Sequence, residues 1–183
     1  KNEKVDMGNI IFGASEYVKD GLMPLNEFIG PSPWQDRMID IVENLYTHIN
    51  DFDSLKKYFK KSNNIEEING EMLQTLSRVY WMTGNQKYLD WAIKIADHYL
   101  LESDLSKVEY LKLRDHGCEI IGGLSELYMT LHLLSHKKKC EYQPPFYRLL
   151  DRILAFGRNS DGFFFNSINL KSNQVIDNRI ADT

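Results

Sequence analysis

The chain has 183 residues, of which 43% are hydrophobic and 26% charged, a balance typical of one folded domain with a substantial core. Its formal charge of −4 and isoelectric point near 5.7 argue against nucleic acid as a partner, because nucleic-acid binding calls for a basic surface. No apolar run reaches the roughly 18 residues of a membrane span, so we expect no membrane partner either. The chain opens with Lys1 and shows no signal-peptide pattern, which predicts a trimmed chain and leaves its compartment open.

Helical periodicity dominates the sequence. We expect Asp20-Gly21 to end the first helix, Ser32-Pro33 to cap and start the second, and Thr83-Gly84-Asn85 to break the third. In chain order, the six predicted helices cover about residues 5–19, 34–49, 65–82, 87–101, 117–135 and 145–156.

The segment 159–178 differs from the rest of the chain. An Asp-Gly turn, the aromatic run Phe163–Phe165 and a polar turn at residues 171–173 predict a small β-hairpin. In a strand these phenylalanines would alternate between faces, so at least one should be exposed. A last helix is expected to begin near Arg179, where only a few residues of the chain remain.

An internal repeat is the most informative pattern in the sequence. A shift of 48 residues lays "EMLQTLSRVYW" (71–81) on "EIIGGLSELYM" (119–129), so that Glu71 falls on Glu119 and Tyr80 on Tyr128. Each segment is followed by a turn and a second helix with aromatics near its start, "KYLDWAIKIADHYL" and "PFYRLLDRILAFG". The repeating unit is therefore an αα-hairpin of roughly 50 residues.

The connections between these helices differ in length. The turn inside the first repeated hairpin is short (83–86), and that inside the second is somewhat longer (136–144). The connections between hairpins are longer still, at about 102–116 and 158–178. Long loops should therefore gather at one end of the helices, which is where binding and catalytic residues usually lie.

The stretch "YWMTGNQKYLDWAIKIADHYL" resembles the hairpins of the six-hairpin, (α/α)6-toroid glycosidase superfamily, in which a helix ends in an aromatic before a Thr-Gly turn and a Lys-Tyr-Leu helix start. The resemblance covers about residues 65–183. It implies an all-α fold in which αα-hairpins form part of an (α/α) toroid. Because six such hairpins need about 300 residues, the resemblance implies that residues 1–183 are one partial ring, a fragment of a longer chain.

In that superfamily the inner helices start at the open face, beside a sugar-binding cleft. The corresponding stretches here are Glu66–Glu71, Asp115–Glu119 and Asp177–Asp182, and all three carry carboxylates. Glycoside hydrolysis needs two carboxyl groups, roughly 5 Å apart for retention or about 6.5–9.5 Å for inversion. For the first and third stretches, however, caps and solvated acids at helix starts are the simpler interpretation.

The stretch "LRDHGCEIIGG" (113–123) is harder to explain as capping alone. Asp115 is a good N-cap residue type, but a cap does not require Arg114 and His116 beside it. The repeat sets Glu67 opposite Asp115 and Ile68 opposite His116, so the Asp-His pair itself is not repeated. We therefore predict Asp115 and His116 as catalytic, with Glu119 as a third candidate that also has a structural role, since Glu71 repeats it.

Substrate binding is assigned to Arg114, to the loop residue Tyr110, to Trp34 at the start of the second helix, and to Asp182. The other prominent aromatics have core spacing; they are Tyr80, Trp81, Trp91 and Tyr128.

Cysteine and histidine patterns predict no metal site and no cofactor. Cys118 and Cys140 would lie at opposite ends of a helix roughly 25 Å long, which is too far apart for a disulfide. His132 and His136 lack the neighbouring glutamate of a metalloprotease motif, and we interpret them as a helix end beside residues 137–139.

The sequence thus predicts a carbohydrate-active enzyme, glycoside hydrolase-like, whose substrate is an oligo- or polysaccharide. Two alternatives stay open. In the first, the hairpins form a non-catalytic interaction scaffold. In the second, the same toroid serves a lyase or epimerase, in which His116 and Tyr110 matter more than paired carboxylates. An incomplete ring would also leave an apolar edge through which the chain can self-associate.

Overall fold

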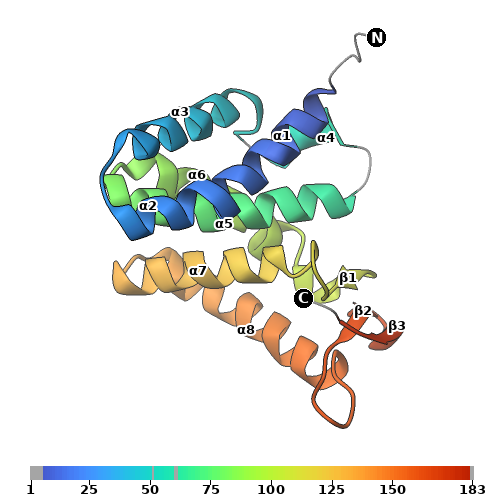
Figure 1. Cartoon of the computed structure of the whole chain (residues 1–183). Coiled ribbons are helices and arrows are strands. Elements are labelled where there is room, and N and C mark those ends of the chain that lie inside the picture. Colours follow the sequence, from blue (N-terminus) through green and yellow to red (C-terminus); the bar gives the residue numbers. More distant parts are fainter. Residues whose placement is uncertain (1–5, 51, 60–61, 182–183) are drawn as a thin grey trace, which may run out of the picture.

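Figure 1 shows a mostly helical fold with a small sheet at one end, in a computed structural model that describes residues 6–50, 52–59 and 62–181. The helices are α1 (Met7–Glu16), α2 (Met23–Ile29), α3 (Pro33–His48), α4 (Phe52–Lys56), α5 (Ser62–Thr83), α6 (Gln86–Asp97), α7 (Glu119–Leu133) and α8 (Lys138–Phe156). Two π-helical segments, η1 (Tyr17–Leu22) and η2 (His98–Glu102), and one 3₁₀ segment, η3 (Leu105–Lys107), accompany them. The strands are β1 (Leu111–Lys112), β2 (Phe165–Asn169) and β3 (Gln174–Ile180). No helix of these residues is long and apolar enough to cross a membrane.

The helices form two rows. The inner row consists of α1, α5 and α7, which run in the same direction and begin at the end that carries the sheet (Figure 1). Contacts along α5 and α7 advance together, from Gln74 with Glu119 to Arg78 with Glu126, which confirms that these two helices are parallel. The outer row consists of α3, α6 and α8, each of which returns along its inner partner. Three αα-hairpins therefore stand side by side, and the second and third contain the two segments of the 48-residue repeat.

The hairpin repeat is visible in the hydrogen bonds of the outer row. Tyr88, near the start of α6, donates to Glu43 Oε1 of α3 at 2.7 Å. Tyr142, near the start of α8, donates in the same way to Asp97 Oδ1 of α6 at 2.7 Å. A lysine on each helix pairs with the same acid, as Lys138 does with Asp97 at 2.7 Å. Helices α6 and α8 are thus each bound to the preceding outer helix by a tyrosine and a lysine that contact the same carboxylate.

Glycines set the close packing of α5 on α7. A Cβ on Gly70 would lie 2.3 Å from the carbonyl carbon of Glu119, and one on Gly123 would lie 2.4 Å from the carbonyl oxygen of Gly70. Real Cβ atoms do not approach backbone this closely, so the two helices cross where neither has a side chain. The interface continues through Leu73, Leu76 and Leu124, which are buried.

Three predicted boundaries are wrong. The first helix does not end at Gly21 but continues through η1, where the Met23 N–H bonds to the Val18 carbonyl five residues back. This π-turn immediately precedes Pro24, which has no N–H to give to a regular helical bond. Ser32 occupies the N-cap position of α3 as predicted, but its side chain makes no capping hydrogen bond.

The other two wrong boundaries lie later in the chain. Helix α8 begins at Lys138, before Pro144 and Pro145, so the turn that separates it from α7 is short. His132 lies in the last turn of α7, as predicted, whereas residues 138–139 start the next helix and do not end one. His136 Nδ1 accepts from the Lys138 N–H at 3.2 Å. The helix predicted at Arg179 does not form, because Arg179 belongs to strand β3.

The predicted β-hairpin is confirmed. Strands β2 and β3 pair antiparallel, and β1 from the long 103–118 connection adds to the other edge of β2. Phe163 and Phe164 are exposed, at 60% and 39%, as expected for at least one of the three phenylalanines. The pairing of β1 with β2 ties the loop that precedes α7 to the end of the chain.

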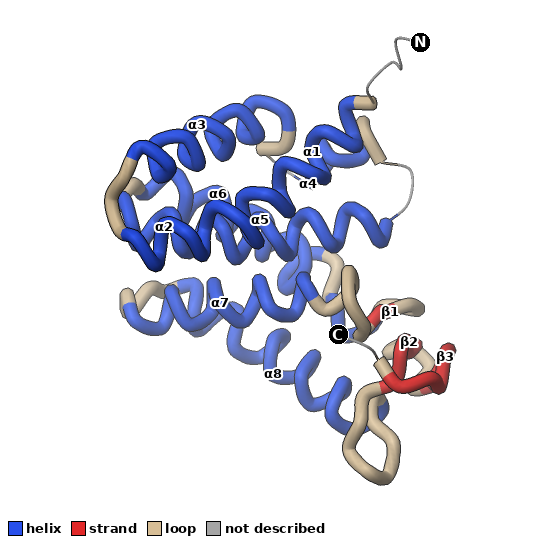
Figure 2. The backbone as a smooth tube through the Cα atoms, viewed as in Figure 1, coloured by secondary structure: helices blue, strands red, loops and turns tan. Residues whose placement is uncertain are grey.

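Connection lengths confirm the predicted asymmetry between the two ends of the fold. The connections at 103–118 and 157–164 lie at the end with the sheet, which we call the sheet end, and so do residues 57–59 after α4 (Figure 2). The short turns at 30–32, 84–85 and 134–137 lie at the opposite end. The inner helices therefore all begin at the end where the long loops gather.

Aromatic burial agrees with the sequence except at one position. Trp91 and Tyr128 are buried and Tyr80 is half-buried, but Trp81 is 51% exposed. Trp81 lines a surface hollow beside Gln35, and its indole N–H donates to Thr130 Oγ1 at 3.1 Å. Cys118 and Cys140 are both free thiols, as predicted.

Candidate functional site

The polar stretch before α7 forms a tight turn against α5. The Arg114 carbonyl accepts the N–H groups of Gly117 and Cys118 at 3.0 and 3.1 Å, which closes the turn. His116 has a φ of 60°, in the left-handed region that histidine enters more readily than most residues. A Cβ on Gly117 would meet the side chain of Lys112 at 2.5 Å, so glycine lets the turn fold back on its own approach strand. The turn directs the imidazole of His116 toward α5.

Asp115 is not a helix cap. Helix α7 begins at Glu119, and Cys118 occupies the N-cap position without a side-chain hydrogen bond. The carboxylate of Asp115 instead lies 3.1 Å from His116 Nε2, and its side chain is 56% exposed. The capping interpretation that the sequence left open is therefore wrong for this residue, and the carboxylate faces solvent beside an imidazole.

His116 bridges two carboxylates of opposite exposure. Its Nδ1 is in hydrogen-bonding contact with Glu67 Oε1, and the side chain of Glu67 is only 7% exposed. Asp115, His116 and Glu67 thus form a row that leads from solvent into the helical bundle. Burial raises the pKa of Glu67, while His116 and then Lys112 oppose the rise.

The glutamates of α5 are not solvated caps. Because α5 begins at Ser62, Glu67 and Glu71 lie in its second and third turns, and both are buried at 5% and 2% exposure. Glu71 accepts a hydrogen bond from Ser15 Oγ of α1 at 2.6 Å. Burial raises the pKa of Glu71 to about 8, with Ser15 and Lys19 opposing the rise. The prediction of solvated acids here is wrong because α1 covers this part of α5.

Glu66 lies near η2 and not near His116. Burial raises its pKa to about 7. Its charge acts on Tyr99 of η2, whose phenol pKa is raised mainly by burial. Adjacent residues on a helix project about 100° apart, so Glu66 faces the outer row while Glu67 faces His116.

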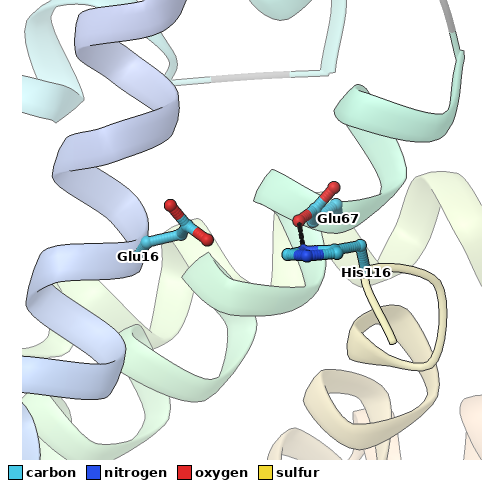
Figure 3. A group of neighbouring side chains, drawn as sticks. All are labelled: Glu16, Glu67 and His116. Carbon is cyan, nitrogen blue, oxygen red and sulfur yellow. Dashed lines mark hydrogen bonds and ion pairs between the residues drawn. The ribbon is translucent and has the colours of Figure 1, made fainter. Parts of the chain in front are cut away.

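Glu16 adds a third carboxylate from the last residue of α1. Figure 3 shows its side chain directed toward Glu67 and His116. Ligand atoms of Glu16, Glu67 and His116 all lie within 4.8 Å of one another. Glu16 raises the pKa of both Glu67 and Glu71 by charge repulsion. Sequence analysis did not single out Glu16, and nothing local in the sequence marks it, because its importance comes from its neighbours on α5 and α7.

Glu119 is held by structural contacts. Lys19 Nζ lies 2.9 Å from its carboxylate, and Gln74 Nε2 donates to the same oxygen at 2.9 Å. Glu71 and Glu119 each bond to the preceding inner helix, through Ser15 and Gln74 respectively. This is the repeated tie between hairpins that the 48-residue repeat suggests.

The predicted substrate-binding residues are not brought together. Arg114 is half-buried in the turn, and Tyr110 is 41% exposed immediately before β1, so both lie at the sheet end. Trp34 is 56% exposed at the start of α3, at the opposite end of the fold. Helix α2 precedes Trp34 and leaves only the short turn at residues 30–32 between them. Asp182 lies outside the described residues.

Sequence and structure comparisons give no relative from which to transfer a role. No family model matches the chain, and no curated protein or solved structure matches it.

Proposed function

We propose that this chain supplies acid–base chemistry to a carbohydrate-active hydrolase, centred on Asp115, His116 and Glu67. The observation that carries the proposal is the row of these three side chains: an exposed carboxylate 3.1 Å from an imidazole that is itself anchored on a buried carboxylate. Parallel inner helices inside an outer row, with the long connections at their starts, support the further proposal that the hairpins are an arc of an (α/α) toroid.

In this proposal each side chain has a separate task. Asp115 is the catalytic residue, which exchanges a proton with the leaving group or the attacking water of a glycosidic bond. His116 is a positioning residue, because its Nε2–H holds the Asp115 carboxylate in one orientation. Glu67 is a positioning residue one step further in, since its buried carboxylate fixes the ring of His116. Glu119, predicted as catalytic, is assigned a structural role because it is neutralised by Lys19.

The test compares Asp115→Asn with the wild-type chain on a panel of oligosaccharides, with the release of reducing ends as the readout. Loss of a general acid–base group is expected to lower turnover by about 10²–10⁴-fold. Asp151→Asn, an exposed change on α8, is the matched control and is expected to keep full activity. Equal turnover of Asp115→Asn and wild type contradicts the assignment, and the absence of turnover on every sugar contradicts the proposed activity.

A second candidate function, a non-catalytic interaction scaffold, is favoured by a different observation. Apolar hollows lie at both flanks of the three hairpins, one of about 630 Å³ between α1 and α3 and one of about 330 Å³ between α7 and α8. Exposed apolar side chains border them, among them Ile10 and Tyr17 on one flank and Leu154 and Phe164 on the other. Self-association detected by light scattering, together with no sugar turnover, would favour the scaffold.

A further inference from the structure

We propose that Glu16, Glu67 and His116 form a site for one divalent transition-metal cation of the Zn²⁺ class. The three side chains come from the end of α1, the second turn of α5 and the turn before α7, and they converge on one point (Figure 3). Cation binding is measured without substrate, so this proposal stands or fails separately from the carbohydrate activity.

The spacing of the donors fits a single ion. One carboxylate oxygen of each glutamate and one imidazole nitrogen lie within 4.8 Å of one another. In a tetrahedral site with metal–ligand distances of about 2.0–2.2 Å, two donors lie about 3.3–3.6 Å apart. The three donors would reach this spacing by side-chain rotations that separate Glu67 from His116 and leave room for the ion. Three protein ligands leave the fourth position of a tetrahedral site for water, the arrangement of catalytic rather than structural zinc sites.

The charges around the cluster call for a cation. Glu67 is buried at 5% exposure and Glu16 is half-buried, with the two carboxylates facing each other. Within residues 6–50, 52–59 and 62–181, the side chain of Glu16 forms no hydrogen bond or ion pair. The nearest lysine on its own chain segment, Lys19, is paired with Asp20 and Glu119 instead. The positive groups that act on Glu67 are His116 and, at longer range, Lys112, and a divalent cation would neutralise the carboxylate pair directly.

The orientation of His116 is a separate observation that points to a metal. Each ring nitrogen faces a carboxylate: Nδ1 contacts Glu67 Oε1, and Nε2 lies 3.1 Å from Asp115 Oδ2. A cation that replaces the proton between Nδ1 and Glu67 would leave Nε2–H to donate to Asp115. Metal-binding histidines usually donate their second ring N–H to a carboxylate in this way. The mixed set of one imidazole nitrogen and two carboxylate oxygens suits Zn²⁺ better than the all-oxygen cations Mg²⁺ and Ca²⁺.

The experiment is a calorimetric titration of the EDTA-treated protein with ZnCl₂, and then with MgCl₂ and CaCl₂. We expect one equivalent of Zn²⁺ to bind tightly and Mg²⁺ and Ca²⁺ to bind at least 100-fold more weakly. Glu16→Gln is the decisive variant because it leaves the Glu67–His116 contact in place, and it is expected to raise the Kd for Zn²⁺ at least 10-fold. Asp115→Asn, which removes only the partner of Nε2, is expected to raise it about 10–100-fold.

Two controls separate this site from incidental zinc binding. His132→Gln removes the exposed member of the His132–His136 pair, and Asp36→Asn removes an exposed acid from α3; neither change should alter the Kd. Circular dichroism of each variant checks that the helical fold is intact before titration. The proposal is overturned if the wild type binds no Zn²⁺, if Glu16→Gln binds it as tightly as the wild type, or if His132→Gln abolishes binding.

Discussion

Glu67 and His116 are 49 residues apart in the sequence, yet the buried carboxylate of one contacts Nδ1 of the other. The contact joins the second turn of α5 to the turn that precedes α7, and so fixes the position of Asp115. The side chain of Glu67 is 7% exposed, and that of His116 is 51% exposed. The pair thus stabilises the junction of two hairpins and also presents an acid to solvent.

The Glu67–His116 pair should be strongly coupled in stability. His116→Ala leaves Glu67 buried without its partner, and we expect it to lower the free energy of unfolding by about 1–3 kcal/mol. Glu67→Gln should cost less, because it removes the buried charge as well. Urea denaturation in EDTA of both single variants and the double variant measures the coupling, and strictly additive changes would contradict the pairing.

Stability should depend on pH through Glu71. Its pKa is raised to about 8 by burial, so the folded protein binds a proton that the unfolded chain, near pKa 4.5, releases. This contribution to stability is complete below about pH 4.5 and is lost as the pH rises toward 8. The groups that act on Glu71 are Ser15, Lys19, Glu16 and Glu67, from α1, η1 and α5.

Glu71→Gln keeps an acceptor for Ser15 and removes the titration. Relative to the wild type, the variant should gain about 3 kcal/mol of stability between pH 5 and pH 8. Urea denaturation in EDTA at four pH values across this range makes the comparison. A stability difference that stays constant with pH would show that Glu71 remains ionised in the folded protein.

Gly70, where α5 crosses α7, should tolerate no larger residue. Gly70→Ala places a Cβ against the backbone of Glu119, and we expect a loss of about 2–3 kcal/mol in the free energy of unfolding. Gly13→Ala is the matched control: Gly13 is helical, and a Cβ there meets nothing within 4 Å. This control should gain about 0.5–1 kcal/mol from better helix propensity. Thermal denaturation measures both variants, and changes in the free energy of unfolding that have the same sign would contradict the close packing of α5 on α7.

The ties of the outer row should contribute measurably to stability. Tyr142→Phe removes the hydroxyl that contacts Asp97 at 2.7 Å and the Ile93 carbonyl at 3.0 Å. We expect a cost of about 1–2 kcal/mol, since two partly buried acceptors lose a donor. Tyr147→Phe, on the exposed face of α8, should change stability by less than about 0.5 kcal/mol. Equal effects of the two changes in urea denaturation would argue against the tie.

Much of the helical architecture was predictable because helices and hairpins are encoded locally. The 48-residue repeat identified the hairpin unit, and the connection lengths placed the long loops at one end, where they lie. Predicted helix boundaries were wrong where the backbone departs from regular α-helical geometry or where a helix contains proline. Gly21 was expected to end a helix that a π-turn carries on to Pro24, and Pro144 was expected to precede a helix that contains it.

The candidate site was predictable only in part. The sequence directed attention to Asp115 and His116 because the repeat did not account for them. It predicted no metal site, because metal motifs are recognised by close spacing whereas the proposed ligands Glu16, Glu67 and His116 come from three separate segments. It also interpreted Glu67 and Glu71 as solvated acids, whereas both are buried.

The sequence by itself thus determined the long helices, how they pair into hairpins, and where the unusual Asp-His pair lies, but it missed α2 and α4. The tertiary structure alone decided that α1 covers the glutamates of α5 and that the turn at Gly117 directs His116 onto Glu67. The physical reason is that periodicity reports which face of a helix is apolar, while burial of a carboxylate depends on the neighbouring helix packed against it. Such contacts form between residues about 50 positions apart, beyond the reach of any local pattern.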